Sequence, residues 1–195
     1  MTASAIPAGI PIPDRDIEYR PFPNEEGRNS RQASLEVPLL VRALRLPKRL
    51  RILEIGCGRG IALAPLARLL DPVRLTGLDI DPAFLAIARA RLDSLGVDAE
   101  LVPGDARALP FPADSFDLVF DFGTCYHIGR AGAALGEVAR VLAPGGRFVH
   151  ETKLSQLLSH PVRSFGRSIP WGDEPRFGRP RRALLWHARP TTGAR

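Results

Sequence analysis

A glycine-rich turn between an expected strand and an expected helix constrains the fold of this chain more than any other feature. The apolar run at residues 50–55 predicts a buried strand, and residues 61–70 predict a helix. Gly56, Gly58 and Gly60 lie between them. Such a turn leaves main-chain N–H groups bare at a helix N-terminus, and the missing Cβ atoms let a ligand lie against the backbone. We therefore expect a ligand site at the carboxyl end of this strand.

The residues around the turn narrow the kind of ligand. Asp79 follows the next apolar run, residues 73–78, where a carboxylate can hold the two hydroxyls of a ribose. The spacing is G-x-G-x-G, because Ile61 occupies the slot of the third glycine in the dinucleotide-binding turn. No phosphate-binding G-x-x-x-x-G-K-[ST] pattern occurs. Glu54 would repel phosphate and attract an ammonium group, so these residues favour a nucleoside that bears an amino acid over NAD or ATP.

With these residues the chain resembles the class I S-adenosylmethionine-dependent methyltransferases that act on small molecules. Five segments carry the resemblance, in the order and at the spacings typical of that family: residues 52–60, 77–82, 104–106, 116–119 and 142–146. The resemblance covers about residues 35–151. It implies S-adenosyl-L-methionine as the cofactor.

Strands and helices are expected to alternate along the chain. Strands are predicted at residues 50–55, 73–78, 99–103, 116–122 and 147–151, and helices at 32–45, 61–70, 82–95 and 131–142. This order predicts an α/β protein, with a Rossmann-like, doubly wound, mostly parallel sheet and helices on both faces. A last strand at residues 184–188 would complete a sheet whose C-terminal end is shortened. Glu137 and Arg140, three residues apart on an expected helix, predict a local ion pair.

The chain is expected to form one domain, residues 32–195, that binds S-adenosylmethionine. Before it, residues 1–31 are expected to be a flexible N-terminal segment and a candidate lid. Residues 14–31 are polar and contain two prolines and a glycine, so we expect them to be irregular. Pro38 falls inside the expected first helix and predicts its true start or a kink.

Eight residues are expected to bind the cofactor. The glycines of the turn would provide close-approach backbone, and Glu54 would attract the methionine ammonium group. Asp79 would bind the ribose hydroxyls. The remaining residues would contact the adenine: Ile80 along its face, Asp105 at its amino group, and Ala106 through its N–H. A structural role stays open for these residues, as turn glycines, turn carboxylates or core side chains.

The candidate catalytic residues follow the fourth expected strand: Asp121, Tyr126 and His127. His127 is the favoured general base because imidazole titrates near neutral pH, with Asp121 as the alternative. Methyl transfer from a sulfonium depends mainly on positioning, and a base helps only where the acceptor must lose a proton. Packing roles for Tyr126 and His127 therefore stay open.

Composition limits the remaining possibilities. Cys57 and Cys125 are expected to be reduced thiols in a cytoplasmic protein, and no metal site is predicted. No apolar stretch is long enough to span a membrane. From residue 151 onward, nine basic residues stand against three acidic ones, and the difference of +6 equals the formal charge of the whole chain. This excess is either a solvated surface or a patch for an anionic substrate, a membrane surface or nucleic acid.

The sequence therefore predicts a methyltransferase with a small-molecule acceptor. Two alternatives stay open: a membrane-lipid methyltransferase that uses the arginine-rich C-terminal segment in peripheral membrane contact, or a non-catalytic S-adenosylmethionine-binding partner subunit. A nucleic-acid acceptor is disfavoured, because residues 121–124 lack the [N/D]-P-P-[Y/F] turn and neither cysteine follows a proline. The oligomeric state is not specified by these patterns.

Overall fold

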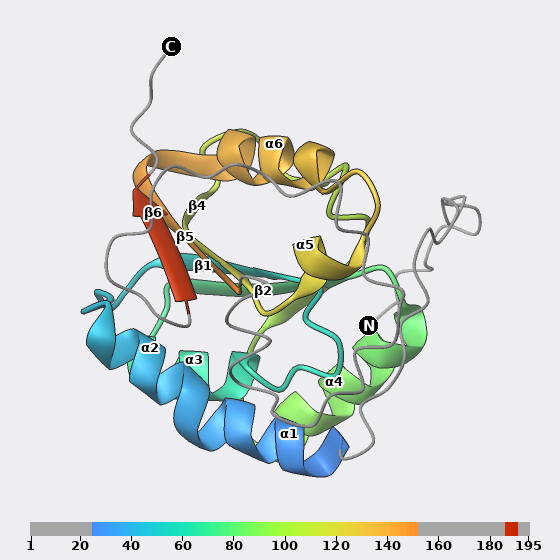
Figure 1. The fold of residues 1–195 in the computed structure, drawn as a ribbon. Helices are drawn as coiled ribbons and strands as arrows, with labels where there is room; N and C mark the ends of the chain where they lie inside the picture. Colours follow the sequence, from blue (N-terminus) through green and yellow to red (C-terminus); the bar gives the residue numbers. More distant parts are fainter. Residues whose placement is uncertain (1–24, 152–185, 191–195) are drawn as a thin grey trace.

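A single sheet with the strand order β3-β2-β1-β4-β5-β6 forms the centre of the protein (Figure 1). The computed structural model describes residues 25–151 and 186–190. The strands are β1 (Arg51–Ile55), β2 (Arg74–Asp79), β3 (Glu100–Pro103), β4 (Phe116–Asp121), β5 (Leu142–Glu151) and β6 (Trp186–Pro190). The first five are parallel, and β6 is antiparallel to β5. The expected α/β class with a mostly parallel, doubly wound sheet is confirmed.

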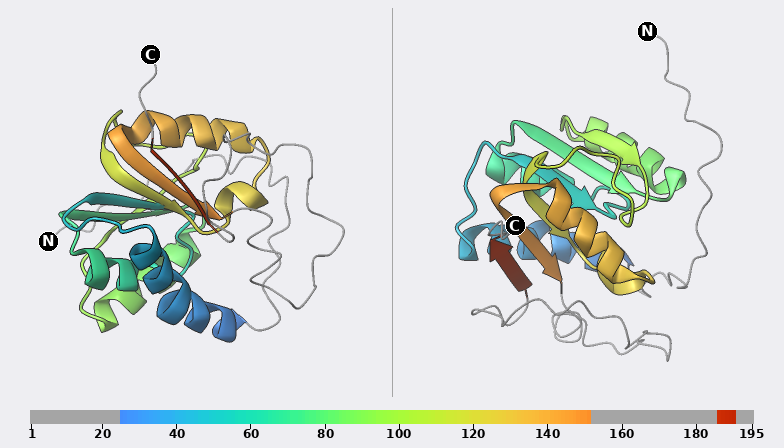
Figure 2. Two further views of the ribbon diagram at one scale, coloured as in Figure 1. Left: turned by 60° about the vertical axis from the view of Figure 1, so that its left-hand side comes forward. Right: turned by 90° about the horizontal axis from the view of Figure 1, so that it is seen from above.

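Helices cover both faces of this sheet (Figures 1 and 2). On one face lie α3 (Leu63–Leu70), α4 (Pro82–Ser94) and the helical N-terminal stretch. On the other face lie α5 (Thr124–His127) and α6 (Ala131–Val141). Asp81 caps α4, since its side chain accepts a hydrogen bond from the Ala83 N–H, and Pro82 occupies the first turn.

The core consists of two apolar layers, one on each face of the sheet. Along β1, Ile52 packs with the layer under α2 and α3, whereas Leu53 and Ile55 pack with the layer under α6. This alternation follows from the two-residue period of a strand. It places Glu54 on the same face as Ile52.

The N-terminal helix begins earlier than the sequence predicted. The chain passes from α1 (Glu25–Arg31) through the π-helical turn η1 (Gln32–Glu36) into α2 (Val37–Ala43). The expectation of irregular structure up to residue 31 is therefore wrong for residues 25–31. Pro38 lies in the first turn of α2 rather than at the start of the whole helix. A proline lacks the N–H of the helical ladder, and the wide turn η1 directly precedes α2, in whose first turn Pro38 lies.

Two further boundaries differ from expectation. β5 begins at Leu142, directly after α6, instead of at residue 147. The segment 144–146 is accommodated by a register shift between β4 and β5 and by a positive φ of 79° at Gly145. The strand expected at 184–188 is observed at 186–190. Among the described residues, no helix is long and apolar enough to span a membrane.

Candidate functional site

The predicted site residues other than Asp105 and Ala106 gather at the carboxyl ends of β1, β2 and β4. These three strands are neighbours: Ile55 at the end of β1 pairs with Leu78 on one side and with Asp121 on the other. The glycine turn follows Ile55 directly. Ligands of open parallel sheets bind at this edge, because the loops there are supported by adjacent strands.

The three glycines of the turn all have left-handed backbone conformations, with φ of 62° at Gly56, 52° at Gly58 and 70° at Gly60. Residues that carry a Cβ atom rarely adopt such φ values, so the turn requires glycine. A Cβ at Gly56 would overlap the Thr124 side chain, and one at Gly60 would come within 3.1 Å of Ala88 Cβ. A Cβ at Gly58 would meet no atom within 4 Å. The protein therefore fills the space beside Gly56 and Gly60 and leaves it open beside Gly58.

Asp79 supports the turn at its open point. Its Oδ2 accepts a hydrogen bond of 2.7 Å from the Gly58 N–H, and its Oδ1 accepts one of 2.9 Å from the Asp81 N–H. Burial raises the pKa of Asp79, while these main-chain donors lower it in part. A carboxylate has about four lone-pair sites, so it can accept further hydrogen bonds beside these two.

Glu54 is a buried residue of β1 with an unsatisfied carboxylate oxygen. It is 2% exposed, and its Oε2 atom has no hydrogen-bond partner. Burial raises the pKa of Glu54 well above its ordinary range, and the negative charges of Asp79 and Asp121 raise it further. The positive charge of Arg28 acts in the opposite direction. An ionised oxygen that is buried without a hydrogen-bond partner costs free energy, so a cationic donor such as an ammonium group would stabilise it.

Asp121 holds the start of α5. Its carboxylate accepts hydrogen bonds from the main-chain N–H groups of Gly123, Thr124 and Cys125, at 3.0, 2.5 and 3.2 Å. Burial raises the pKa of Asp121 to about 6, although these donors and the Cys125 thiol lower it in part. The carboxylate thus organises the chain that follows β4. Catalysis by Asp121 stays a prediction, and its contacts give it a supporting role.

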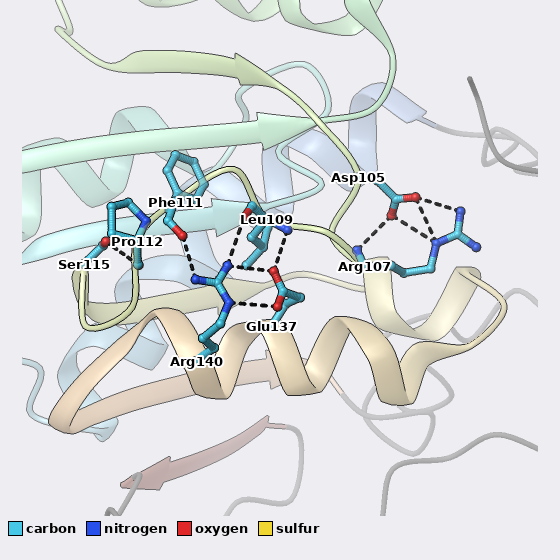
Figure 3. A network of polar contacts seen from close by, with 8 residues as sticks. All are labelled: Asp105, Arg107, Leu109, Phe111, Pro112, Ser115, Glu137 and Arg140. Atoms are coloured by element: carbon cyan, nitrogen blue, oxygen red, sulfur yellow. Dashed lines mark hydrogen bonds and ion pairs between the residues drawn. The ribbon is translucent and has the colours of Figure 1, made fainter. Parts of the chain in front are cut away.

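The adenine-binding residues predicted after β3 are held by a second set of contacts. Asp105 forms an ion pair with Arg107 at 2.9 Å and accepts a hydrogen bond from the Arg107 N–H at 2.8 Å (Figure 3). Ala106 is buried among the residues of the α6 layer. Part of the acceptor capacity of Asp105 is therefore taken by a residue that the sequence analysis did not identify.

An ion pair on α6 holds the segment between β3 and β4, which carries Asp105 and Ala106. Glu137 and Arg140 form the predicted ion pair, at 2.7 Å (Figure 3). Glu137 also accepts a hydrogen bond from the Leu109 N–H. Arg140 donates to the carbonyl oxygens of Leu109 and Phe111, at 2.9 and 2.7 Å. The pair is therefore more than a local helix contact, because it ties the β3–β4 connection to α6.

The other predicted residues also lie near this edge. Ile80 is half-buried and directly follows Asp79. The main chain of Tyr126 and His127 forms the end of α5, just beyond β4. Within the described part of the chain no group of His, Cys, Asp or Glu could hold a metal ion. The catalytic roles of Tyr126 and His127 stay predictions.

Several known proteins are similar in sequence to the part of the chain that carries the site. Residues 52–146 match the family model described as "Methyltransferase domain". Fatty-acid O-methyltransferase of Mycolicibacterium smegmatis is 42% identical over 100 residues, which cover 51% of this chain and 36% of that protein. Phthiotriol/phenolphthiotriol dimycocerosates methyltransferase of Mycobacterium leprae is 40% identical over 100 residues, with the same two coverages. The aligned part thus spans about a third of the length of these relatives.

Two solved structures show the same fold. The PH0226 protein from Pyrococcus horikoshii has a TM-score of 0.58 and 32% identity, over 72% of this chain and 68% of that one. The [4+2]-cyclase SpnF has a TM-score of 0.56 and 26% identity, over 60% of this chain and 43% of that one.

The strand order, the three left-handed glycines and Asp79 define a Rossmann-like α/β protein whose site has the features expected for S-adenosylmethionine. The family match over the motif-bearing region and the relatives at about 40% identity identify it further. The predicted resemblance to the class I S-adenosylmethionine-dependent methyltransferases is confirmed over residues 52–146.

Proposed function

We propose that the protein transfers a methyl group from S-adenosyl-L-methionine to a small, lipid-like acceptor. The observation that carries the cofactor part is the pairing of an open backbone at Gly58 with an unpartnered, buried oxygen on Glu54. The acceptor class is supported by the names of the relatives, a fatty-acid O-methyltransferase and a phthiotriol dimycocerosates methyltransferase.

The residues at the site fit this cofactor. S-Adenosyl-L-methionine supplies an activated methyl group on a sulfonium. Gly58 lets a ligand approach the main chain, since no side chain covers it. Asp79 has lone pairs left for the two ribose hydroxyls after its bonds to Gly58 and Asp81. Glu54 Oε2 would accept a hydrogen bond from the methionine ammonium group, which would also compensate the buried negative charge.

The proposed adenine contacts come from residues that follow β2 and β3. Ile80 would lie along the face of the ring, next to Asp79. Asp105 would accept from the amino group while it remains paired with Arg107, and the Ala106 N–H would donate to the ring. The ion pair with Arg107 would fix the orientation of the Asp105 carboxylate before the ligand binds.

The acceptor side is proposed to lie at α5. There, His127 would remove a proton from a hydroxyl acceptor, and Tyr126 would line the pocket. The contacts of Asp121 with the start of α5 suggest that it positions this helix, and no proton-transfer role needs to be assigned to it. A carboxylate acceptor is already ionised at neutral pH, so for a fatty acid positioning alone would suffice.

The alternative functions gain no support from the described residues. The membrane-lipid alternative relied on the basic residues from 151 onward, nearly all of which lie outside the described ranges. We keep peripheral membrane contact, a cytoplasmic location and the absence of a nucleic-acid partner as parts of the proposal.

A transfer assay tests the proposal directly. The full chain would be incubated with S-adenosyl-L-methionine labelled on its methyl group and with fatty acids of graded length, matched fatty alcohols, glycine and transfer RNA. We expect label in the organic phase with a fatty acid or an alcohol, and none in glycine or RNA. Transfer to glycine alone would contradict the lipid-like acceptor, and no transfer to any acceptor would contradict the enzymatic function.

A further inference from the structure

We propose that the outer face of the N-terminal helical stretch docks on an anionic lipid surface. Leu35 and Leu39 form the apolar part of this docking face, and the cations that follow them form its charged part. The proposal rests on the lipid-like acceptor of the proposed function and deepens it, because it names the surface from which that acceptor is taken. It uses none of the basic residues from 151 onward.

The first argument is the exposure of two neighbouring leucines. Leu35 on η1 is 58% exposed and Leu39 on α2 is 47% exposed. They are four residues apart, so they are neighbours on one side of the helical stretch. The other exposed large apolar side chains of the described ranges stand apart from one another in the sequence: Val73, Ile87 and Leu95. A single exposed leucine is ordinary, whereas two on adjacent turns enlarge the apolar patch and favour an interaction surface.

The second argument is that the fold does not use these two leucines. The inner side of the same stretch packs in the core layer through Val37 and Leu40, which are 0% and 4% exposed. One apolar stripe is enough for a helix that covers a sheet, and this stretch carries further leucines on its outer side. The stretch lies on the opposite side of the sheet from α6 (Figures 1 and 2). The outer leucines therefore suit a partner outside the fold.

The third argument is the charge beside the leucines, which selects an anionic partner. Arg42, Arg45 and Lys48 follow Leu39 and are exposed. Within the described part of the chain none of the three forms an ion pair. The acidic residue between the two leucines, Glu36, is half-buried, and the arginines of α1 offset its charge. Leucines beside arginine and lysine on a helix are typical of binding at the interface of an anionic membrane.

The same helical stretch also reaches the candidate site. α1 continues through η1 into α2, and the charge of Arg28 on α1 lowers the pKa of Glu54 against the larger effect of burial. A docked protein would therefore hold its site close to the lipid surface, where a lipid-like acceptor is concentrated. A second copy of the chain fits the docking face less well, because a symmetric contact would bring this basic surface against itself.

Co-sedimentation of the full chain with vesicles tests the proposal. Vesicles of phosphatidylcholine are compared with vesicles that also contain phosphatidylglycerol. We expect the wild type to bind the anionic vesicles, with an affinity that falls as salt is added. The double variant Leu35→Gln, Leu39→Gln should bind them at least about tenfold more weakly. The double variant Arg42→Gln, Lys48→Gln should lose about fivefold per removed charge at low salt.

Leu95→Gln is the matched control. Leu95 is an exposed leucine at the end of another helix, α4, but it lies between Asp93 and Asp98 in the sequence. The control should bind the anionic vesicles as the wild type does. Glutamine keeps a helix propensity close to that of leucine, and thermal unfolding checks that each variant is folded. The charge variant decides the matter if the leucine variant fails to fold.

Three results would overturn the docking face. They are no binding of the wild type to anionic vesicles, wild-type affinity in both double variants, and a wild-type dimer that the leucine variant loses while vesicle binding is unchanged. Methyl transfer to a short-chain acceptor without vesicles is measured separately. Transfer without vesicle binding would overturn the docking face alone, whereas vesicle binding without transfer would contradict the proposed function alone.

Discussion

The side chain of Thr124 occupies the space beside Gly56 that a Cβ would need. Its hydroxyl donates a hydrogen bond of 3.0 Å to the carbonyl oxygen of Ile55, the last residue of β1. The two partners of this bond are 69 residues apart in the chain. Thr124 also begins α5, so this contact joins the glycine turn to the helix that carries Tyr126 and His127. The cofactor side and the proposed acceptor side of the site are therefore mechanically linked.

Gly56 and Gly58 should respond differently to substitution by alanine. Gly56→Ala would drive a methyl group into Thr124, and we expect a loss of stability of several kcal/mol, about 2–4. Gly58→Ala meets no atom, so it should cost only about 1–2 kcal/mol for its left-handed backbone. It should nevertheless weaken S-adenosylhomocysteine at least tenfold, since its methyl group would enter the ligand space. Thermal unfolding and calorimetry measure both effects; unchanged affinity in Gly58→Ala would place the ligand elsewhere.

Glu54→Gln should stabilise the fold and weaken the binding of the ligand. The substitution removes a carboxyl group whose ionised form is disfavoured by burial and whose Oε2 lacks a donor, so the free energy of unfolding at pH 8 should rise by about 1–3 kcal/mol. The affinity for S-adenosylhomocysteine should fall at least tenfold, because the ammonium group loses a charged partner. Denaturant titration and calorimetry on the same preparation give both values. A less stable variant with unchanged affinity would mean that Glu54 supports the fold alone.

Asp121 should contribute a pH dependence of stability with a defined sign. Its pKa in the folded protein is about 6 against an ordinary value of 3.8, so the folded state holds the proton more tightly than the unfolded state. The contribution of Asp121 to the free energy of unfolding therefore falls as pH rises from about 4 to about 6, by up to about 3 kcal/mol. Asp121→Asn should be less stable than wild type throughout, with a gap that narrows over this range. A gap that widens as pH rises would contradict the assigned pKa direction.

His127→Ala tests the proposed base. With a hydroxyl acceptor, turnover should fall by about 10²- to 10⁴-fold while the affinity for the cofactor stays nearly intact. With a fatty-acid acceptor the same variant should lose little, because no proton has to be removed. A pH–rate profile of wild type and variant with both acceptors makes the comparison. Parallel losses of turnover and cofactor affinity would instead indicate a packing role for His127.

Much of the fold could be predicted because its buried strands are apolar runs and because proline and glycine lie at the ends of its elements. The apolar runs that form β1 and β2, and the Pro82-to-Gly96 boundaries of α4, give elements whose ends agree within about two residues. The ion pair of Glu137 with Arg140 could be predicted for the same local reason. Its attachment to Leu109 and Phe111 could not, because that contact depends on how two distant segments pack.

The parts of the site that were missed depend on tertiary structure. Thr124 contacts Gly56 only because β4 is placed beside β1. The ion pair of Arg107 with Asp105 looks like an ordinary turn contact in the sequence. Residues 25–31 were expected to be irregular because Gly27 and two earlier prolines are helix breakers, yet α1 forms there.

Calorimetric titration of the wild-type chain with S-adenosylhomocysteine, NADH and ATP tests the cofactor assignment most directly. The open backbone at Gly58, the carboxylate of Asp79 that is proposed to bind the ribose hydroxyls, and the unpartnered Oε2 of Glu54 all favour a nucleoside with an amino-acid end and no phosphate. We expect micromolar-range binding of S-adenosylhomocysteine and no measurable binding of NADH or ATP. Tight binding of NADH together with no binding of S-adenosylhomocysteine would contradict the assignment of this site.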